Sequence, residues 1–169
     1  MGTADTLIAE LEQESEGTRR VLERVPEERL SWRPHPKSMS LGQLALHVAE
    51  VPGAVADLLD APSAEAPEFS TRPEASSRNE LLTALDGSIA RATGKLASWG
   101  EAGLTAEWRM TQGAETLMAM PRLAMVRSVM LNHWYHHRGQ LIVYLRLLDV
   151  PVPAIYGDSA DEAPAFARA

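Results

Sequence analysis

The sequence predicts an all-α protein, a four-helix bundle with a short irregular or hairpin segment before the last helix. Four segments of about 20 residues repeat apolar side chains at intervals of three and four residues, which is typical of amphipathic helices. Prolines and polar clusters separate these segments, and little of the chain alternates as strands do. The chain has 169 residues and no evident linker, so residues 1–169 are expected to form a single domain.

The first helix is expected over residues 5–25, where one apolar stripe runs until Pro26 ends it. A proline-rich loop follows, and Ser40 has the position and chemistry of an N-cap for the second helix. That helix carries its apolar stripe over residues 41–58. Because Pro52 lies within the stripe, a kink or a local break is expected there.

Residues 61–76 are rich in proline, alanine, serine and glutamate and show no periodicity, which predicts a long connection. Fully extended, it would span about 50 Å, more than the roughly 30 Å of a 20-residue helix. It therefore allows the second and third helices to run parallel without requiring it.

The third helix is expected over residues 77–99. Residues 107–121 alternate around Gln112-Gly113, which indicates a short hairpin or an irregular loop.

The composition is that of an ordinary soluble globular protein, with 45% hydrophobic and 23% charged residues. The net charge of −7 and the scattered Lys and Arg residues argue against a nucleic-acid partner. No apolar run approaches 18 residues and the N-terminus lacks signal-peptide features, so we expect no membrane partner and a cytoplasmic location. The absence of cysteine excludes thiolate ligands and a cysteine nucleophile.

The last helix, expected over residues 121–148 with Pro121 in its first turn, places two histidines on its apolar face. His133 and His137 are one turn apart, which brings their Cβ atoms within about 6 Å, so both rings can bind one ion. His136 points about 60° away from His133, toward the edge of the face. We expect it to support a ligand or to face solvent.

His47, on the apolar face of the second helix, is the candidate third ligand. A lone buried histidine is more often a hydrogen-bonded core residue, and a pair four residues apart is weak evidence by itself. Three neutral rings in one bundle core would each need a partner there, and three charged rings would repel one another. One divalent cation satisfies all three and keeps open positions, as reactive sites do. His35, among prolines, is interpreted as a loop residue.

Three stretches of the chain resemble the DinB-like family of small bacterial four-helix-bundle proteins. They are WRP at 32–34 with SMSLGQLALH at 38–47, NHWYHHRGQL at 132–141, and YLRLLDVPVPAIYGDSADE at 144–162. The resemblance implies an up-down-down-up bundle, frequent homodimers, and a divalent metal held by three histidines. Carried over residue by residue, the ligands are His47, His133 and His137. The glycine of the family's L-G-V-P turn is Asp149 here.

The resemblance also implies a class of chemistry. Characterised relatives in the superfamily are transferases or isomerases that use the thiols mycothiol or bacillithiol. This favours a metal-dependent thiol S-transferase or hydrolase, in which one divalent ion activates a bound thiol or water for attack on a small-molecule substrate. Because the chain has no cysteine, a low-molecular-weight thiol would come from outside. Zinc or nickel is expected first, with iron or manganese as alternatives, since imidazoles accept several divalent ions.

No catalytic residue is assigned from the sequence. An acid or base would have to lie near the ion, and four polar residues within one turn of the ligands are candidates: Gln43, Glu50, His136 and Gln140. Each is equally well explained as a solvated residue or as a support for a ligand. The alternative function is a non-catalytic metal-binding or dimeric interaction protein with a stress-related role. Trp32, Trp99 and Trp108 could serve its interface, although core packing explains them more simply.

Overall fold

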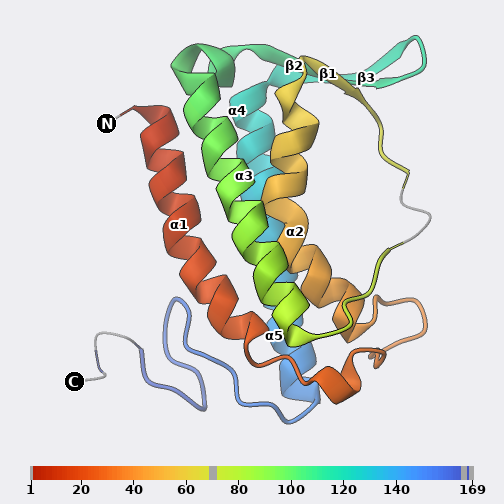
Figure 1. The fold of residues 1–169 in the computed structure, drawn as a ribbon, viewed down its shortest axis with the longest axis vertical. Helices are drawn as coiled ribbons and strands as arrows, with labels where there is room; N and C mark the ends of the chain where they lie inside the picture. Colours follow the sequence, from red (N-terminus) through yellow and green to blue (C-terminus); the bar gives the residue numbers. More distant parts are fainter. Residues whose placement is uncertain (1, 69–71, 165–166, 168–169) are drawn as a thin grey trace.

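Four long helical segments lie side by side in the computed structural model, which describes residues 2–68, 72–164 and 167, and a small sheet closes one end (Figure 1). The helices are α1 (Thr3–Leu22), α2 (Leu41–Asp60), α3 (Arg78–Thr105), and a continuous last helix made of α4 (Arg122–Met125), the π-helical η2 (Val126–Asn132) and α5 (His133–Leu147). A 3-10 turn, η1 (Glu27–Arg29), follows α1. The strands are β1 (Ser63–Glu65), β2 (Glu107–Gln112) and β3 (Glu115–Pro121).

The helices run in both directions along the long axis of the molecule. In Figure 1, α1 descends, α2 and α3 both ascend, and the last helix descends. Helix α2 lies between α3 and the last helix and packs against both, while α1 packs mainly against α3. The structure is therefore mostly helical, as predicted, but it also contains a sheet that an all-α class does not include.

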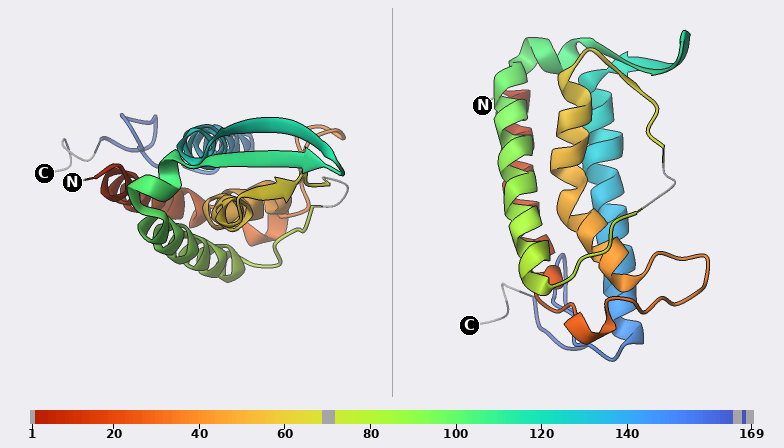
Figure 2. Two further views of the ribbon diagram at one scale, coloured as in Figure 1. Left: turned by 90° about the horizontal axis from the view of Figure 1, so that it is seen from above. Right: turned by 45° about the vertical axis from the view of Figure 1, so that its right-hand side comes forward.

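The three strands form one sheet in the order β1-β2-β3. Strands β2 and β3 pair antiparallel around Gly113, whose φ of 57° suits a residue without a side chain, so the predicted hairpin over residues 107–121 is confirmed. Strand β1 pairs parallel with β2 and lies over the end of α2 (Figure 2). We expected no regular structure there. Three residues are too few for an alternating pattern, so β1 depends on backbone pairing with a distant segment.

The N-caps of α2 and α3 follow from their serines. Ser40 Oγ accepts the backbone N–H of Gln43, which confirms the predicted cap, and Ser77 Oγ accepts that of Glu80 in the same way. The prediction that the third helix ends near residue 99 is wrong, because α3 continues to Thr105. The backbone breaks at Gly100, with φ 54°, and then forms further helical turns to Thr105.

The ends of the last helix differ in part from prediction. Pro121 is not in its first turn: it is the final residue of β3 and caps α4 in an extended conformation. At the other end Val150 N–H bonds the carbonyl of Leu145 and Asp149 N–H bonds that of Arg146, the Schellman pattern. Asp149 itself has φ 57°, so it adopts the left-handed conformation that the glycine of the L-G-V-P turn takes without strain.

Pro52 does not break α2, which is helical from Leu41 to Asp60. Proline has no N–H, so the carbonyl oxygen of Val48 cannot receive the usual hydrogen bond from residue 52. The indole Nε1 of Trp134, on α5, donates to this oxygen at 2.8 Å. The side chain of Trp134 is fully buried, so the bond lies between the helices, away from water. The proline therefore makes a backbone acceptor of α2 available to the last helix.

The next backbone group of α2 is satisfied by α3. The N–H of Gly53 donates to Ser88 Oγ at 2.8 Å, and the Ser88 hydroxyl donates to the carbonyl oxygen of Glu50 at 3.1 Å. A Cβ on Gly53 would lie 2.8 Å from the Cα of Ser88, so α2 and α3 approach closely at this point. The hydrogen bonds around Pro52 thus connect α2 to both α5 and α3 at the same height in the bundle.

The core is a continuous cluster of leucine, valine and alanine side chains from all four helical segments, joined by Trp108 and Trp134. Trp108 is fully buried and anchors the hairpin, whereas Trp32 packs edge-on against Tyr144 and Trp99 lies 5.0 Å from the guanidinium of Arg122. In the described part of the chain, no helix is both long and apolar enough to cross a membrane.

We expect Trp134→Phe to lower the free energy of unfolding by about 1–3 kcal/mol, because it leaves the Val48 carbonyl buried without its donor. Urea unfolding measures this loss. Trp99→Phe is the matched control, since the Trp99 indole donates at 3.3 Å to the exposed Asp60, which water can solvate instead. An equal loss in both variants would contradict the role given to the Val48 carbonyl.

Candidate metal centre

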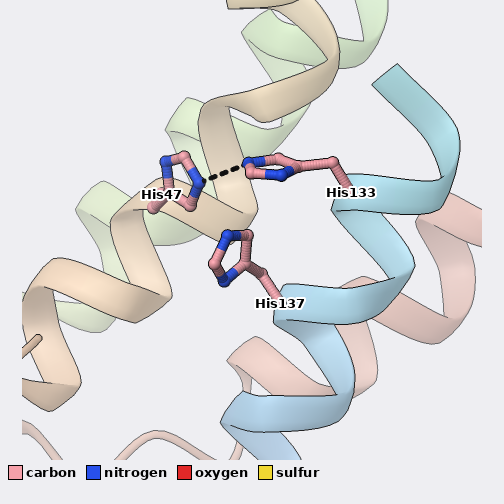
Figure 3. Close-up of side chains that lie close together, drawn as sticks. All are labelled: His47, His133 and His137. Atoms are coloured by element: carbon pink, nitrogen blue, oxygen red, sulfur yellow. Dashed lines mark hydrogen bonds between the residues drawn. The ribbon is translucent and has the colours of Figure 1, made fainter. Parts of the chain in front are cut away.

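Three histidine rings face one another where α2 and α5 pack together (Figure 3). His47 comes from α2, and His133 and His137 come from the first two turns of α5. The Nε2 atoms of His47 and His133 are 3.1 Å apart, and the ring centroids are separated by 5.2, 4.6 and 4.4 Å. One nitrogen from each ring lies within 4.8 Å of the others. The structure thus brings together the three histidines that the sequence singles out.

The hydrogen bond between the Trp134 indole and the Val48 carbonyl connects α5 to α2 at the height of the histidines. Val48 directly follows His47 in the chain, and Trp134 directly follows His133. This interhelical hydrogen bond therefore helps to set the height of the turn with His47 against the turn with His133. On the outer side of α5, Nδ1 of His137 is 2.7 Å from Oε1 of Gln140. Since an amide oxygen only accepts, Nδ1 carries the proton and Nε2 keeps its lone pair for an ion.

The donor set fits a divalent ion. Two nitrogens bound to one tetrahedral ion at about 2.0–2.1 Å would lie about 3.3 Å apart, close to the 3.1 Å between His47 and His133. Without an ion, the two Nε2 atoms could share only one hydrogen, and His137 would still face them. Three imidazoles can hold one ion and leave a coordination position open, as catalytic sites do and closed structural sites do not.

The electrostatics keep these rings neutral. Burial, reinforced by His137, His133 and Arg72, lowers the pKa of His47 to about 3. Burial also lowers the pKa of His137 to about 4, with the hydrogen bond to Gln140 acting in the opposite direction. The pKa of His133 is lowered by burial and, to a smaller extent, by the charges of His136 and Arg72. All three rings therefore offer lone pairs at neutral pH.

The histidines lie at the edge of the core rather than inside it, which corrects the sequence interpretation. The three rings are half-buried, while the fully buried face of α5 is formed by Trp134, Arg138, Leu141 and Leu145. The helical wheel places the histidines on the apolar side of the helix. The centre of that side, however, is formed by the residues that directly follow them, Trp134 and Arg138. A site at the edge is open to small molecules, whereas a site in the core would not be.

A pocket of about 390 Å³ opens beside His47 and His133. Most of its wall is apolar: Val51, Ala54, Val55, Leu58, Pro67 and Val129. Glu50 and Arg72 are its other polar residues. Burial raises the pKa of Glu50, the nearby Arg91 opposes this shift, and Glu80 adds to it. Glu50 is the one of the four acid or base candidates that lines this pocket.

The other candidates have different surroundings. Gln43 belongs to the cap of α2, where its Oε1 accepts the N–H of Ser40 and its Nε2 donates to the carbonyl of Arg72. Gln140 supports His137, as described above. His136 is exposed, with its ring 5.1 Å from that of His137, as the wheel indicates. His35 is exposed in the loop before α2, as expected.

Arg138, next to His137, is a supporting residue that the sequence analysis missed. Its side chain is only 2% exposed and pairs with Glu14 of α1 at 2.6 Å, while it also bonds Thr18 Oγ1 and the Tyr156 hydroxyl. It therefore joins α5 to α1 and to the C-terminal segment at the residue that follows His137. The available signal was its position four residues after Trp134, which places a charged residue on the buried face.

Comparison with known proteins agrees with this architecture. The model of the DinB family matches residues 1–165. The chain belongs to the DinB family. A comparison with curated proteins gives no match.

Solved structures with the same fold include three related bacterial proteins. A DinB-like protein from Bacillus cereus is 23% identical with a TM-score of 0.69, covering 90% of this chain and 97% of its own. One from Bacillus subtilis is 19% identical with a TM-score of 0.67, covering 89% and 97%. A family member from Exiguobacterium sibiricum is 23% identical with a TM-score of 0.63, covering 89% and 95%. These structures share the fold of this chain.

We expect the metal-free protein to lose stability as the pH falls from about 7 to about 4. The pKa values of His47 and His137, about 3 and about 4, lie below the value of 6.5 for an unperturbed histidine. As the pH falls, the unfolded chain therefore takes up protons before the native one, which favours unfolding; stability rises again with pH and levels off above about 7. Urea unfolding across this range measures the slope. His47→Gln should flatten it, and an unchanged slope would contradict the assignment.

Proposed function

We propose that the protein is a metal-dependent enzyme, a thiol S-transferase or a hydrolase, whose ion is held by His47, His133 and His137. The observation that carries the proposal is the position of these rings. Three neutral imidazoles converge, and two of them, His47 and His133, line a largely apolar pocket that a small molecule can fill. Zinc or nickel is proposed as the ion, with iron or manganese as alternatives.

The chemistry would need few residues from the chain. A divalent ion at the site would lower the pKa of a thiol or water beside it and so supply a nucleophile at neutral pH. Gln140 holds the His137 ring in the tautomer that binds metal. Glu50, three residues after His47 on α2, lines the same pocket and can accept the proton that the thiol or water gives up. Burial raises its pKa, which makes it a stronger base.

The thiol would be a low-molecular-weight thiol of the cytoplasm, because the chain has no cysteine of its own. The resemblance to the DinB-like family, whose characterised superfamily relatives use mycothiol or bacillithiol, supports this part of the proposal.

A second candidate function, a non-catalytic homodimeric module, is favoured by one observation. Val143 and Leu147 lie one turn apart on α5 and are 57% and 58% exposed, an apolar pair that a second copy could cover.

Metal content tests the site directly. We expect protein purified without nickel resin to contain about one equivalent of divalent metal by mass spectrometry, and His47→Ala to lose most of it. His136→Ala is the matched control, since it removes an exposed imidazole beside the site and should leave the content unchanged. Equal metal content in all three proteins would contradict the ligand assignment.

Glu50→Gln should lower kcat/KM by about 10²–10⁴-fold while the metal content stays the same, because the glutamine cannot accept the proton. The assay incubates metal-loaded protein with a chromogenic electrophile and a panel of small thiols, or with water alone. Asp57→Asn, on the exposed side of α2, is the control. If the native protein binds metal but its rate never exceeds the uncatalysed one, the non-catalytic alternative replaces the enzyme.

A further inference from the structure

We infer that the pocket beside the histidines takes a small molecule with an apolar body and an anionic group, and that Arg72 recognises the anion. This deepens the proposed function, on which it rests, by naming the class of substrate. Three features of the pocket support this class of ligand: the apolar wall along the two helices, the position of Arg72, and the volume.

The apolar wall extends from the histidines in one direction. Val51 follows His47 by one turn on α2, and Leu58 follows two turns later, so these residues share a face of the helix. From His47 to Leu58 the helix rises about 16 Å. On the last helix, which runs the other way, Val129 precedes His133 by one turn. Both walls therefore lead from the histidines toward the sheet end of the molecule, which suits a molecule with its reacting end at the histidines.

Arg72 supplies the positive charge at the polar end. It lines the main pocket with His47, His133 and Glu50, and also a small adjoining cavity of about 40 Å³. The hydrogen bond from Gln43 Nε2 to its carbonyl oxygen, at 3.1 Å, ties its backbone to the first turn of α2. A guanidinium offers two parallel N–H groups that match a carboxylate, so an anion beside the reacting group is the chemistry it would recognise.

The volume limits the size of the ligand. About 390 Å³ lies toward the lower end of the roughly 300–1,000 Å³ of small-molecule pockets. It suits a ligand part with on the order of ten non-hydrogen atoms. Apolar walls favour aromatic or alkyl groups in that space, because binding removes the apolar surface of these groups from water.

The test uses calorimetry on the metal-free protein, so that an anion cannot bind an ion in place of Arg72. The probes are 4-phenylbutyrate, which has both features, 4-phenyl-1-butanol, which lacks the charge, and acetate, which lacks the body. Arg72→Gln removes the cation. Ala54→Phe places a bulky ring in the apolar part of the pocket, at an exposed position of α2. The matched controls are Arg33→Gln and Ala90→Phe, both exposed and outside the pocket.

We expect 4-phenylbutyrate to bind at least about tenfold more tightly than either partial probe, and Arg72→Gln and Ala54→Phe each to weaken it about tenfold. The controls should bind as the native protein does. Equal affinity for the acid and the alcohol, or unchanged binding in either pocket variant, would overturn the inference, as would binding only after metal is added. Because these measurements need no metal, their failure is distinct from the failure of the proposed function, which metal content and turnover report.

Discussion

The hydrogen bond from the Trp134 indole to the Val48 carbonyl is the contact on which the geometry of the histidines depends. It exists because Pro52 has no N–H to offer that carbonyl, and because the bulky indole reaches it from α5. Each partner is the direct neighbour of a histidine in the chain. The residue after this proline, Gly53, donates its N–H to Ser88 of α3, so α3 is bonded to α2 at the same height. A residue that usually weakens a helix here joins three helices at the level of the site.

Polar residues elsewhere hold the back of α5. Arg138 is nearly excluded from water, and its charge is balanced by Glu14 and surrounded by the rings of Trp134, Tyr135 and Tyr156, at 5.3–6.0 Å. A buried charge of this kind is tolerated only when its donors are satisfied together. The C-terminal segment thus contributes to the position of α5 through Tyr156. The histidine side of α5 stays half open, and the neighbouring buried face is closed by this network.

Much of the candidate site could be predicted because its histidines follow local helical periodicity. His133 and His137 are one helical turn apart whatever the rest of the chain does, and His47 stands on a stripe of leucine and valine. The cap at Ser40 and the hairpin around Gly113 also follow from local chemistry. Strand β1, the cap formed by Pro121 and the turns beyond Gly100 could not be predicted, because each depends on a partner that is distant in the sequence.

The sequence by itself determined which side chains are available for chemistry: imidazoles and carboxylates, no thiols, and helices that carry three histidines on apolar faces. Only the tertiary structure decided how those faces meet. It placed the rings at the edge of the core and brought Glu50 and Arg72 to the same pocket. The reason is physical, since helical periodicity fixes directions around one axis, whereas the rotation and height of one helix against another are set by contacts between distant residues such as Val48 and Trp134.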